Sequence, residues 1–168
     1  MIGNLSYDQV SQVVEVLSYL VYNSNDIKIK EQKIMYKKTL TYTDYNGESR
    51  TEDFYFNLNK AEIIDMQLSI NGGFDAYIKK ITSEQDTSKL IKLFKDLILR
   101  SYGEKSLDGK RFIKDMEKTV EFTQTEAFSE LYVKLATDTN EAVAFIKGIF
   151  PSSPEFDAKL NEIVAENK

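Results

Sequence analysis

The architecture follows from one segment, YKKTLTYTDYNGESRTEDFYFNL, at residues 36–58. Residues 36–43 and 51–58 are rich in β-branched and aromatic residues, which favour strands. Between them, Asp44 suits the first position of a type I turn, and Gly47 can adopt the left-handed conformation that follows it. The segment therefore predicts an antiparallel β-hairpin.

The register of this hairpin depends on the length of its loop. A two-residue loop at 46–47 would put Phe54 and Phe56 on the face opposite Leu40, whereas a three-residue loop pairs Tyr36 with Phe56. Because side chains alternate between the two faces of a strand, the three-residue loop gathers the large apolar residues on one face. We predict that loop, and a face that packs on helices or another sheet, since a lone hairpin is marginally stable. This face carries Tyr36, Leu40, Tyr42, Phe54, Phe56 and Leu58.

From Asn57 onward the sequence predicts helices alone. Asn59 caps the first of them and forms a capping box with Glu62. Residues 90–99 are apolar nearly all round, which favours a central buried helix, and Gly103 is expected to end that helix as a C-terminal cap. The fold class predicted is mainly α (α+β), a helical domain with one antiparallel β-hairpin packed on it.

Two further helices begin at recognisable caps. Thr123 with Glu126 forms a capping box, and Asp138 with Glu141 begins the next helix, which Pro151 closes. An apolar stripe at helical spacing follows the first of these caps and consists of Phe128, Leu131, Tyr132 and Leu135.

The two ends of the chain are predicted to flank a core at residues 35–151. Ser6 and Gln9 form a capping box at the start of an N-terminal helical extension, residues 1–34. Its apolar face either packs on the domain itself or docks on a partner or a second copy. Ser153 and Pro154 open a C-terminal helix within residues 152–168.

Composition narrows the function. The 168 residues include 27 acidic and 22 basic ones, for a net charge of −5, and neither Cys nor His. Disulfides, thiolate or His-based catalysis and Cys- or His-ligated zinc are thereby excluded, and we expect no metal or cofactor. The acidic balance disfavours nucleic acid. No membrane span is expected, because the apolar run at residues 10–22 is short and contains Glu15.

Few residues suggest a binding or catalytic role. Lys105, Lys110, Arg111 and Lys114 form a basic loop that either holds an anion or an acidic partner or is simply solvated. The acid pair Glu52 and Asp53 lies in a strand, where neighbours face opposite ways. The pair Asp138 and Glu141 is explained by helix capping. A hydrolase using only carboxylates is the remaining enzyme hypothesis, and no spacing supports it.

Four segments carry a family resemblance. They are YKKTLTYTDYNG (36–47), TEDFYFNL (51–58), RSYGEKS with DGKRF (100–106 and 108–112), and EFTQTEAFSEL (121–131). Together they resemble the tail assembly chaperones of tailed bacteriophages that infect Gram-positive bacteria, over about residues 35–150. Chains of that family usually begin near the equivalent of Met35, so residues 1–34 would be an extension.

The resemblance implies a protein without enzymatic activity that coats the apolar tape-measure protein, keeps it soluble and hands it over as tail-tube subunits polymerise. It also implies action in the host cytoplasm and absence from the mature virion. A longer frameshift product of the same gene and homo-oligomers are further expected partners. The alternative is a structural virion protein of the tail or head–tail connector. The partner-binding residues we predict are Lys105, Lys110, Arg111, Phe112, Phe122, Phe128 and Tyr132.

Overall fold

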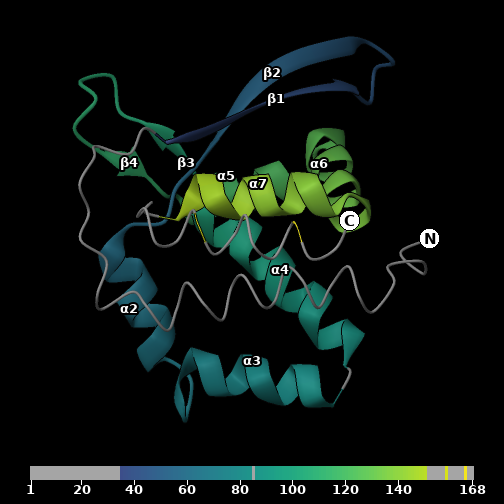
Figure 1. Ribbon diagram of the computed structural model, residues 1–168. Helices are drawn as coiled ribbons and strands as arrows, with labels where there is room; N and C mark the ends of the chain where they lie inside the picture. The colour runs from purple at the N-terminus through teal and green to yellow at the C-terminus, as the bar shows by residue number, and fades with distance from the viewer. Residues whose placement is uncertain (1–34, 85, 151–157, 159–164, 166–168) are drawn as a thin grey trace.

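The computed structural model describes residues 35–84, 86–150, 158 and 165 (Figure 1). The predicted opening helix and nearly all of the predicted C-terminal helix lie outside these residues, and the division of the chain into three pieces stays a prediction. The strands are β1 (Tyr36–Thr43), β2 (Ser49–Phe56), β3 (Tyr102–Lys105) and β4 (Phe112–Ile113). The helices are α2 (Lys60–Leu68), α3 (Gly73–Ser83), α4 (Thr87–Ser101), α5 (Met116–Thr123), α6 (Glu126–Thr137) and α7 (Thr139–Ile149).

The predicted hairpin and its register are confirmed. β1 and β2 pair antiparallel, with Tyr36 opposite Phe56 and Thr43 opposite Ser49. The N–H of Asp44 donates to the carbonyl oxygen of Glu48 at 2.8 Å, which closes a three-residue loop. Within that loop Gly47 has a φ of 83°, the left-handed conformation expected of it.

The apolar face of the hairpin packs on the helices, as predicted. Leu40 and Phe56 are buried, and Tyr36, Tyr42 and Phe54 pack against the core. In the view of Figure 1 the sheet lies to one side of α5, α6 and α7, and the turn of the hairpin projects beyond them.

The prediction that only helices follow residue 57 is wrong. β3 pairs antiparallel with β2, and β4 pairs with β3, so that the order in the sheet is β1-β2-β3-β4. The α+β class is confirmed, but the sheet is larger than one hairpin. Both added strands are short, and their pairing is a tertiary contact that no local pattern marks.

Gly103 is also placed differently from the prediction. α4 ends at Ser101, and Gly103 lies within β3 without a left-handed backbone. A Cβ added at Gly103 would lie 2.7 Å from the carbonyl oxygen of Ile113 and 2.7 Å from Cε1 of Phe112. This glycine therefore allows two strands to approach closely instead of capping a helix.

Of the three N-terminal caps predicted within the described residues, at Asn59, Thr123 and Asp138, two are confirmed. Asn59 and Glu62 form the capping box of α2. The N–H of Glu62 donates to the side-chain oxygen of Asn59 at 3.0 Å, and the N–H of Asn59 donates to the carboxylate of Glu62 at 2.8 Å. Asp138 caps α7. Thr123 is instead the last residue of α5, and Thr125 caps α6 by accepting from the N–H of Phe128 at 3.2 Å.

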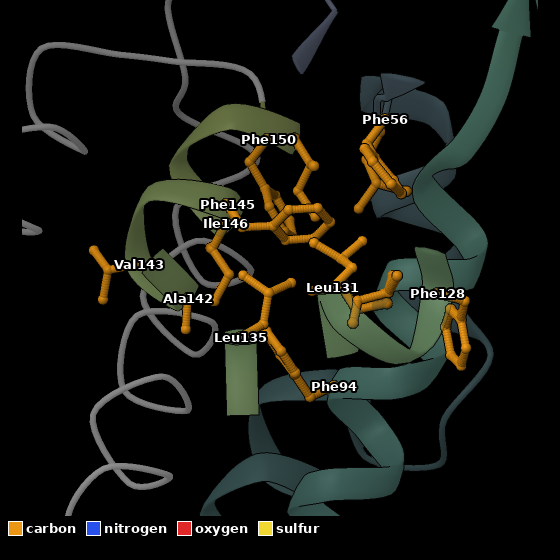
Figure 2. Packing of buried hydrophobic residues seen from close by; sticks show 14 of the residues in the cluster. Phe56, Phe94, Phe128, Leu131, Leu135, Ala142, Val143, Phe145, Ile146 and Phe150 are labelled. Atoms are coloured by element: carbon orange, nitrogen blue, oxygen red, sulfur yellow. The ribbon is translucent and has the colours of Figure 1, made fainter. Parts of the chain in front are cut away.

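The core lies among the helices and against one face of the sheet, and Figure 2 shows side chains of α4, α6 and α7 gathered near Phe56 of β2. The rings of Phe56 and Phe145 meet edge to face, with centroids 5.1 Å apart, and Tyr102 stacks on Phe122 at 4.3 Å. On α4, Phe94 is buried while Lys95 is exposed. The helix over residues 90–99 is therefore amphipathic and buried on one side only, whereas a central buried helix was predicted from its nearly all-round apolar sequence.

Candidate functional site

A groove runs between α2, α3 and α4, with a cavity volume of about 350 Å³. We call it the α2–α4 groove. It is lined by Met66, Ser69, Ile70, Tyr77, Lys92, Leu93, Asp96, Leu97 and Arg100.

Local sequence explains how these helices come to enclose a groove. α2 ends at Leu68, and Gly72 and Gly73 follow with φ values of 84° and 86°. This left-handed pair lets the chain turn back into α3, and the N–H of Gly73 donates to Ile70 at 2.8 Å. Asp86 then caps α4 by accepting from the N–H of Lys89. α4 therefore starts at a defined residue and presents one side to α2 and α3.

The groove has an apolar floor. Met66 and Leu97 are buried, and Ile70, Tyr77 and Leu93 are half-buried, so their outer parts remain accessible. Such a surface suits apolar side chains of a partner, because burying them removes apolar area from water on both sides.

The rim of the groove is charged. Lys92, Asp96 and Arg100 are exposed, and none of them forms an ion pair with another residue of the described part of the chain. An apolar floor with a charged rim matches an amphipathic helix, whose apolar face enters the groove while its polar flanks meet the rim.

Sequence reasoning missed this groove, although one signal for it was available. Residues 92, 96 and 100 are all ionisable and are spaced by four, which places them along one side of a helix. That stripe marks a polar edge on a segment that otherwise looks apolar all round.

The predicted basic residues lie at the end of β3 and on the loop that joins β3 to β4: Lys105 is the last residue of β3, and Lys110 and Arg111 belong to the loop. Lys105, Lys110 and Arg111 are exposed there. The loop is ordered by Ser106, whose hydroxyl donates to Asp108 and accepts from the N–H of Arg111 at 3.0 Å. The structure thus brings the three cations together at the β3–β4 turn, where they can meet an acidic partner.

Lys114, the fourth cation of that predicted loop, has a structural role instead. It follows β4 directly and forms an ion pair with Glu62 of α2, and its burial lowers its pKa. Its ammonium group also lies 5.9 Å from the centroid of the Phe112 ring.

The predicted aromatic residues divide between core and surface. Phe122 and Phe128 are only 2% and 8% exposed, and their rings lie 5.4 Å apart within the core. Tyr132 is half-buried and stacks on Phe128 at 5.9 Å, and burial raises its pKa. Phe112 is also half-buried. Of this set, Tyr132 and Phe112 can contact a partner without opening the core.

The acid pairs are engaged structurally. Asp53 accepts from Thr39 at 2.6 Å on one face of the sheet, while Glu52 accepts from the hydroxyl of Tyr42 on the other. Asp138 caps α7, and Glu141 forms ion pairs with Lys38 and Lys134. Among the described residues, no group of three or more acidic residues is arranged to hold a metal ion. In the same part of the chain, no helix combines the length and the apolar character that a membrane crossing requires.

Comparisons with known proteins assign the chain to a family. A family model described as phage tail assembly chaperone matches residues 35–164. Neither the curated proteins nor the solved structures contain a match to the chain. Since the family match covers most of the sequence, including every helix and strand described above, the chain belongs to the phage tail assembly chaperone family.

Proposed function

We propose that this protein binds the phage tape-measure protein through the α2–α4 groove and keeps it soluble until the tail tube polymerises around it. The observation that carries the proposal is the groove itself: an accessible apolar floor with a charged rim, in a chain that belongs to a family of tail assembly chaperones. A tape-measure protein is long, helical and apolar, and such a client needs a surface of this kind.

Apolar burial supplies the main driving force in this proposal. Each apolar side chain that the client buries fully contributes about 1.5–3 kcal/mol before the costs of ordering are subtracted. Charge has a secondary role, because exposed ion pairs contribute little and are screened by salt. Lys92 and Arg100 at the rim, and the basic loop at Lys105, Lys110 and Arg111, can meet acidic residues on the client.

The remaining parts of the proposal concern place and partners. The protein acts without enzymatic chemistry in the host cytoplasm, meets tail-tube protein during assembly, and is absent from the finished virion. A longer frameshift product of the same gene is a further partner.

Co-expression with the tape-measure protein tests the proposal. We expect the wild-type chain to bring the client into the soluble fraction, and Leu93→Asp to abolish this effect, because a hydrated carboxylate in the groove floor opposes the burial of the client's apolar side chains. The matched control is Val133→Asp, which makes the same kind of change on α6 at a side chain that is 50% exposed and outside the groove. Circular dichroism confirms that both variants fold.

Two results would contradict the proposal. One is a soluble client with Leu93→Asp as well as with the wild type, because the groove would then not be the binding surface. The other is recovery of the protein in stoichiometric amounts from purified virions, which would favour the structural role in the tail or connector.

A further inference from the structure

Within the part of the chain that the structure describes, no strand pairs with the outer edge of β2 beside β3, which we call the free edge. The two strands pair only at Tyr55 with Gly103 and at Phe56 with Tyr102. Beyond these two pairs β2 and β3 are not paired, while β3 continues along its other edge as the partner of β4. Between β2 and β3 opens a cleft of about 620 Å³, lined by residues 52–55 of β2 and residues 102–105 of β3.

The hydrogen-bonding pattern shows which backbone groups face this edge. The N–H of Asp44 donates to the carbonyl oxygen of Glu48, which makes residues 44 and 48 a hydrogen-bonded pair. Because such pairs alternate along an antiparallel ladder, the N–H and C=O groups of Ser49, Thr51 and Asp53 point away from β1. These residues are exposed, and an exposed edge of this kind is a template for another strand.

We propose that two copies of the chain associate by pairing their β2 strands antiparallel across this edge, about a two-fold axis at Thr51. In that register Arg50 of each copy lies directly opposite Glu52 of the other, and Ser49 lies opposite Asp53. The Arg–Glu positions are non-hydrogen-bonded pairs, in which opposite side chains are closest, at about 4.5 Å between Cα atoms. The occupant of the edge is therefore a second copy of this chain.

Charge selects this register over its neighbours. A two-fold axis at Arg50 would place Arg50 of one copy opposite Arg50 of the other, and Glu48 of one copy opposite Glu52 of the other. An axis at Glu52 would place the two Glu52 side chains opposite each other. Like charges directly opposite destabilise a strand pair, whereas the axis at Thr51 forms two pairs of opposite charge.

The length of the free edge excludes the remaining registers. An axis at Asp53 would require Tyr55, which already pairs with Gly103. An axis at Ser49 would require Gly47, which lies in the turn with a φ of 83°. Residues 49–53 are thus the segment available. The residue of the second copy that enters the mouth of the cleft opposite Asp53 is Ser49, whose side chain is small.

Contacts within the hairpin already position the side chains of Arg50 and Glu52 at this edge. Arg50 forms an ion pair with Asp44, and Glu52 accepts from the hydroxyl of Tyr42, while both remain exposed. The pairing therefore adds backbone hydrogen bonds and opposite charges without rearranging the hairpin. In the view of Figure 1 the turn end of the hairpin projects beyond α5, α6 and α7.

Sedimentation of the full-length chain over a concentration series tests the proposal. We expect the wild type to form a dimer, and Arg50→Glu and Glu52→Arg each to be monomeric, because each change puts like charges opposite one another. An equimolar mixture of the two variants should dimerise again, because one strand then carries two acids and the other two bases. Dimerisation of this mixture would show that each variant alone fails to dimerise because of its charges and not because it fails to fold.

Thr51→Pro and Thr41→Pro form a matched pair for the backbone. Each removes an N–H from an outer edge of the hairpin without removing a bond between β1 and β2, since Thr41 and Thr51 are opposite each other and both point outward. Thr51→Pro should abolish the dimer and Thr41→Pro should not.

Several outcomes would overturn the proposal. These are a wild-type chain that stays monomeric up to millimolar concentration, a dimer that Arg50→Glu or Thr51→Pro leaves intact, and a mixture of the charge variants that does not dimerise. Recovery of an extended client peptide on this edge in place of a second copy would also overturn it. The α2–α4 groove lies elsewhere on the molecule, so the proposed function and this self-association can each fail without the other.

Discussion

At Gly148, helix α7 passes directly against the ring of Tyr36 on β1. A Cβ added at Gly148 would overlap that ring. Alanine normally stabilises a helix interior by about 0.5–1 kcal/mol relative to glycine. Here we expect Gly148→Ala to lower the free energy of unfolding by roughly 1–3 kcal/mol, as overpacking does, because Tyr36 must move. Denaturant titration measures the change.

Ala144→Gly, at an exposed position of the same helix, is the control for intrinsic helix propensity. It should lower the free energy of unfolding by about 1 kcal/mol or less. A Gly148→Ala chain as stable as the wild type, or more so, would show that β1 and α7 do not approach as closely as described.

Single residues also show where prediction from sequence alone fails. Gly103 has two readings in sequence, a helix cap or a close approach of strands, and only the contacts of Phe112 and Ile113 decide between them. Thr123 and Thr125 both suit an N-terminal cap, and only the structure shows that α5 ends at Thr123 and that Thr125 caps α6.

Among the elements, β1 and α7 are joined by the ion pair between Lys38 and Glu141. The hydrogen bond from Lys38, with help from Lys134, lowers the pKa of Glu141. A carboxyl whose pKa is lower in the folded than in the unfolded chain stabilises the fold above the unfolded pKa. This contribution is lost as the pH falls through the folded pKa.

Glu141→Gln should therefore lower the free energy of unfolding by about 0.5–1 kcal/mol at neutral pH. The difference from the wild type should vanish in acid, once the wild-type carboxyl is also protonated. Denaturant titrations at a series of pH values measure both. Glu130→Gln is the control, since Glu130 is exposed and forms no ion pair with a described residue. A difference for Glu141→Gln that persists unchanged into acid would contradict the assigned pair.

The elements also show how far sequence could go. The hairpin at 36–56 was predictable to its register, because a turn signal and the alternation of Leu40, Phe54 and Phe56 are local. β3 and β4 were not, because they are short and defined by pairing with distant residues. The α2–α4 groove escaped prediction for the same reason: three helices form it, and only the charge spacing on α4 hinted at it.

For the whole molecule, the family match begins at residue 35, where the predicted core also begins. If residues 1–34 are an added module, a chain shortened to start at Met35 should remain folded and unfold cooperatively. Circular dichroism and denaturant titration measure this. Aggregation of the shortened chain, or loss of near-ultraviolet signal with helicity retained, would show that the first residues complete the core.

The central claim is that an apolar helix of the tape-measure protein binds in the α2–α4 groove. Calorimetric titration of such a helical segment into the full chain, over a range of temperatures, tests it most directly. We predict binding with a negative heat-capacity change that survives added salt, is lost with Leu93→Asp and is kept with Val133→Asp. Absence of binding to the wild type, or binding that salt abolishes and Leu93→Asp leaves unchanged, would contradict the claim.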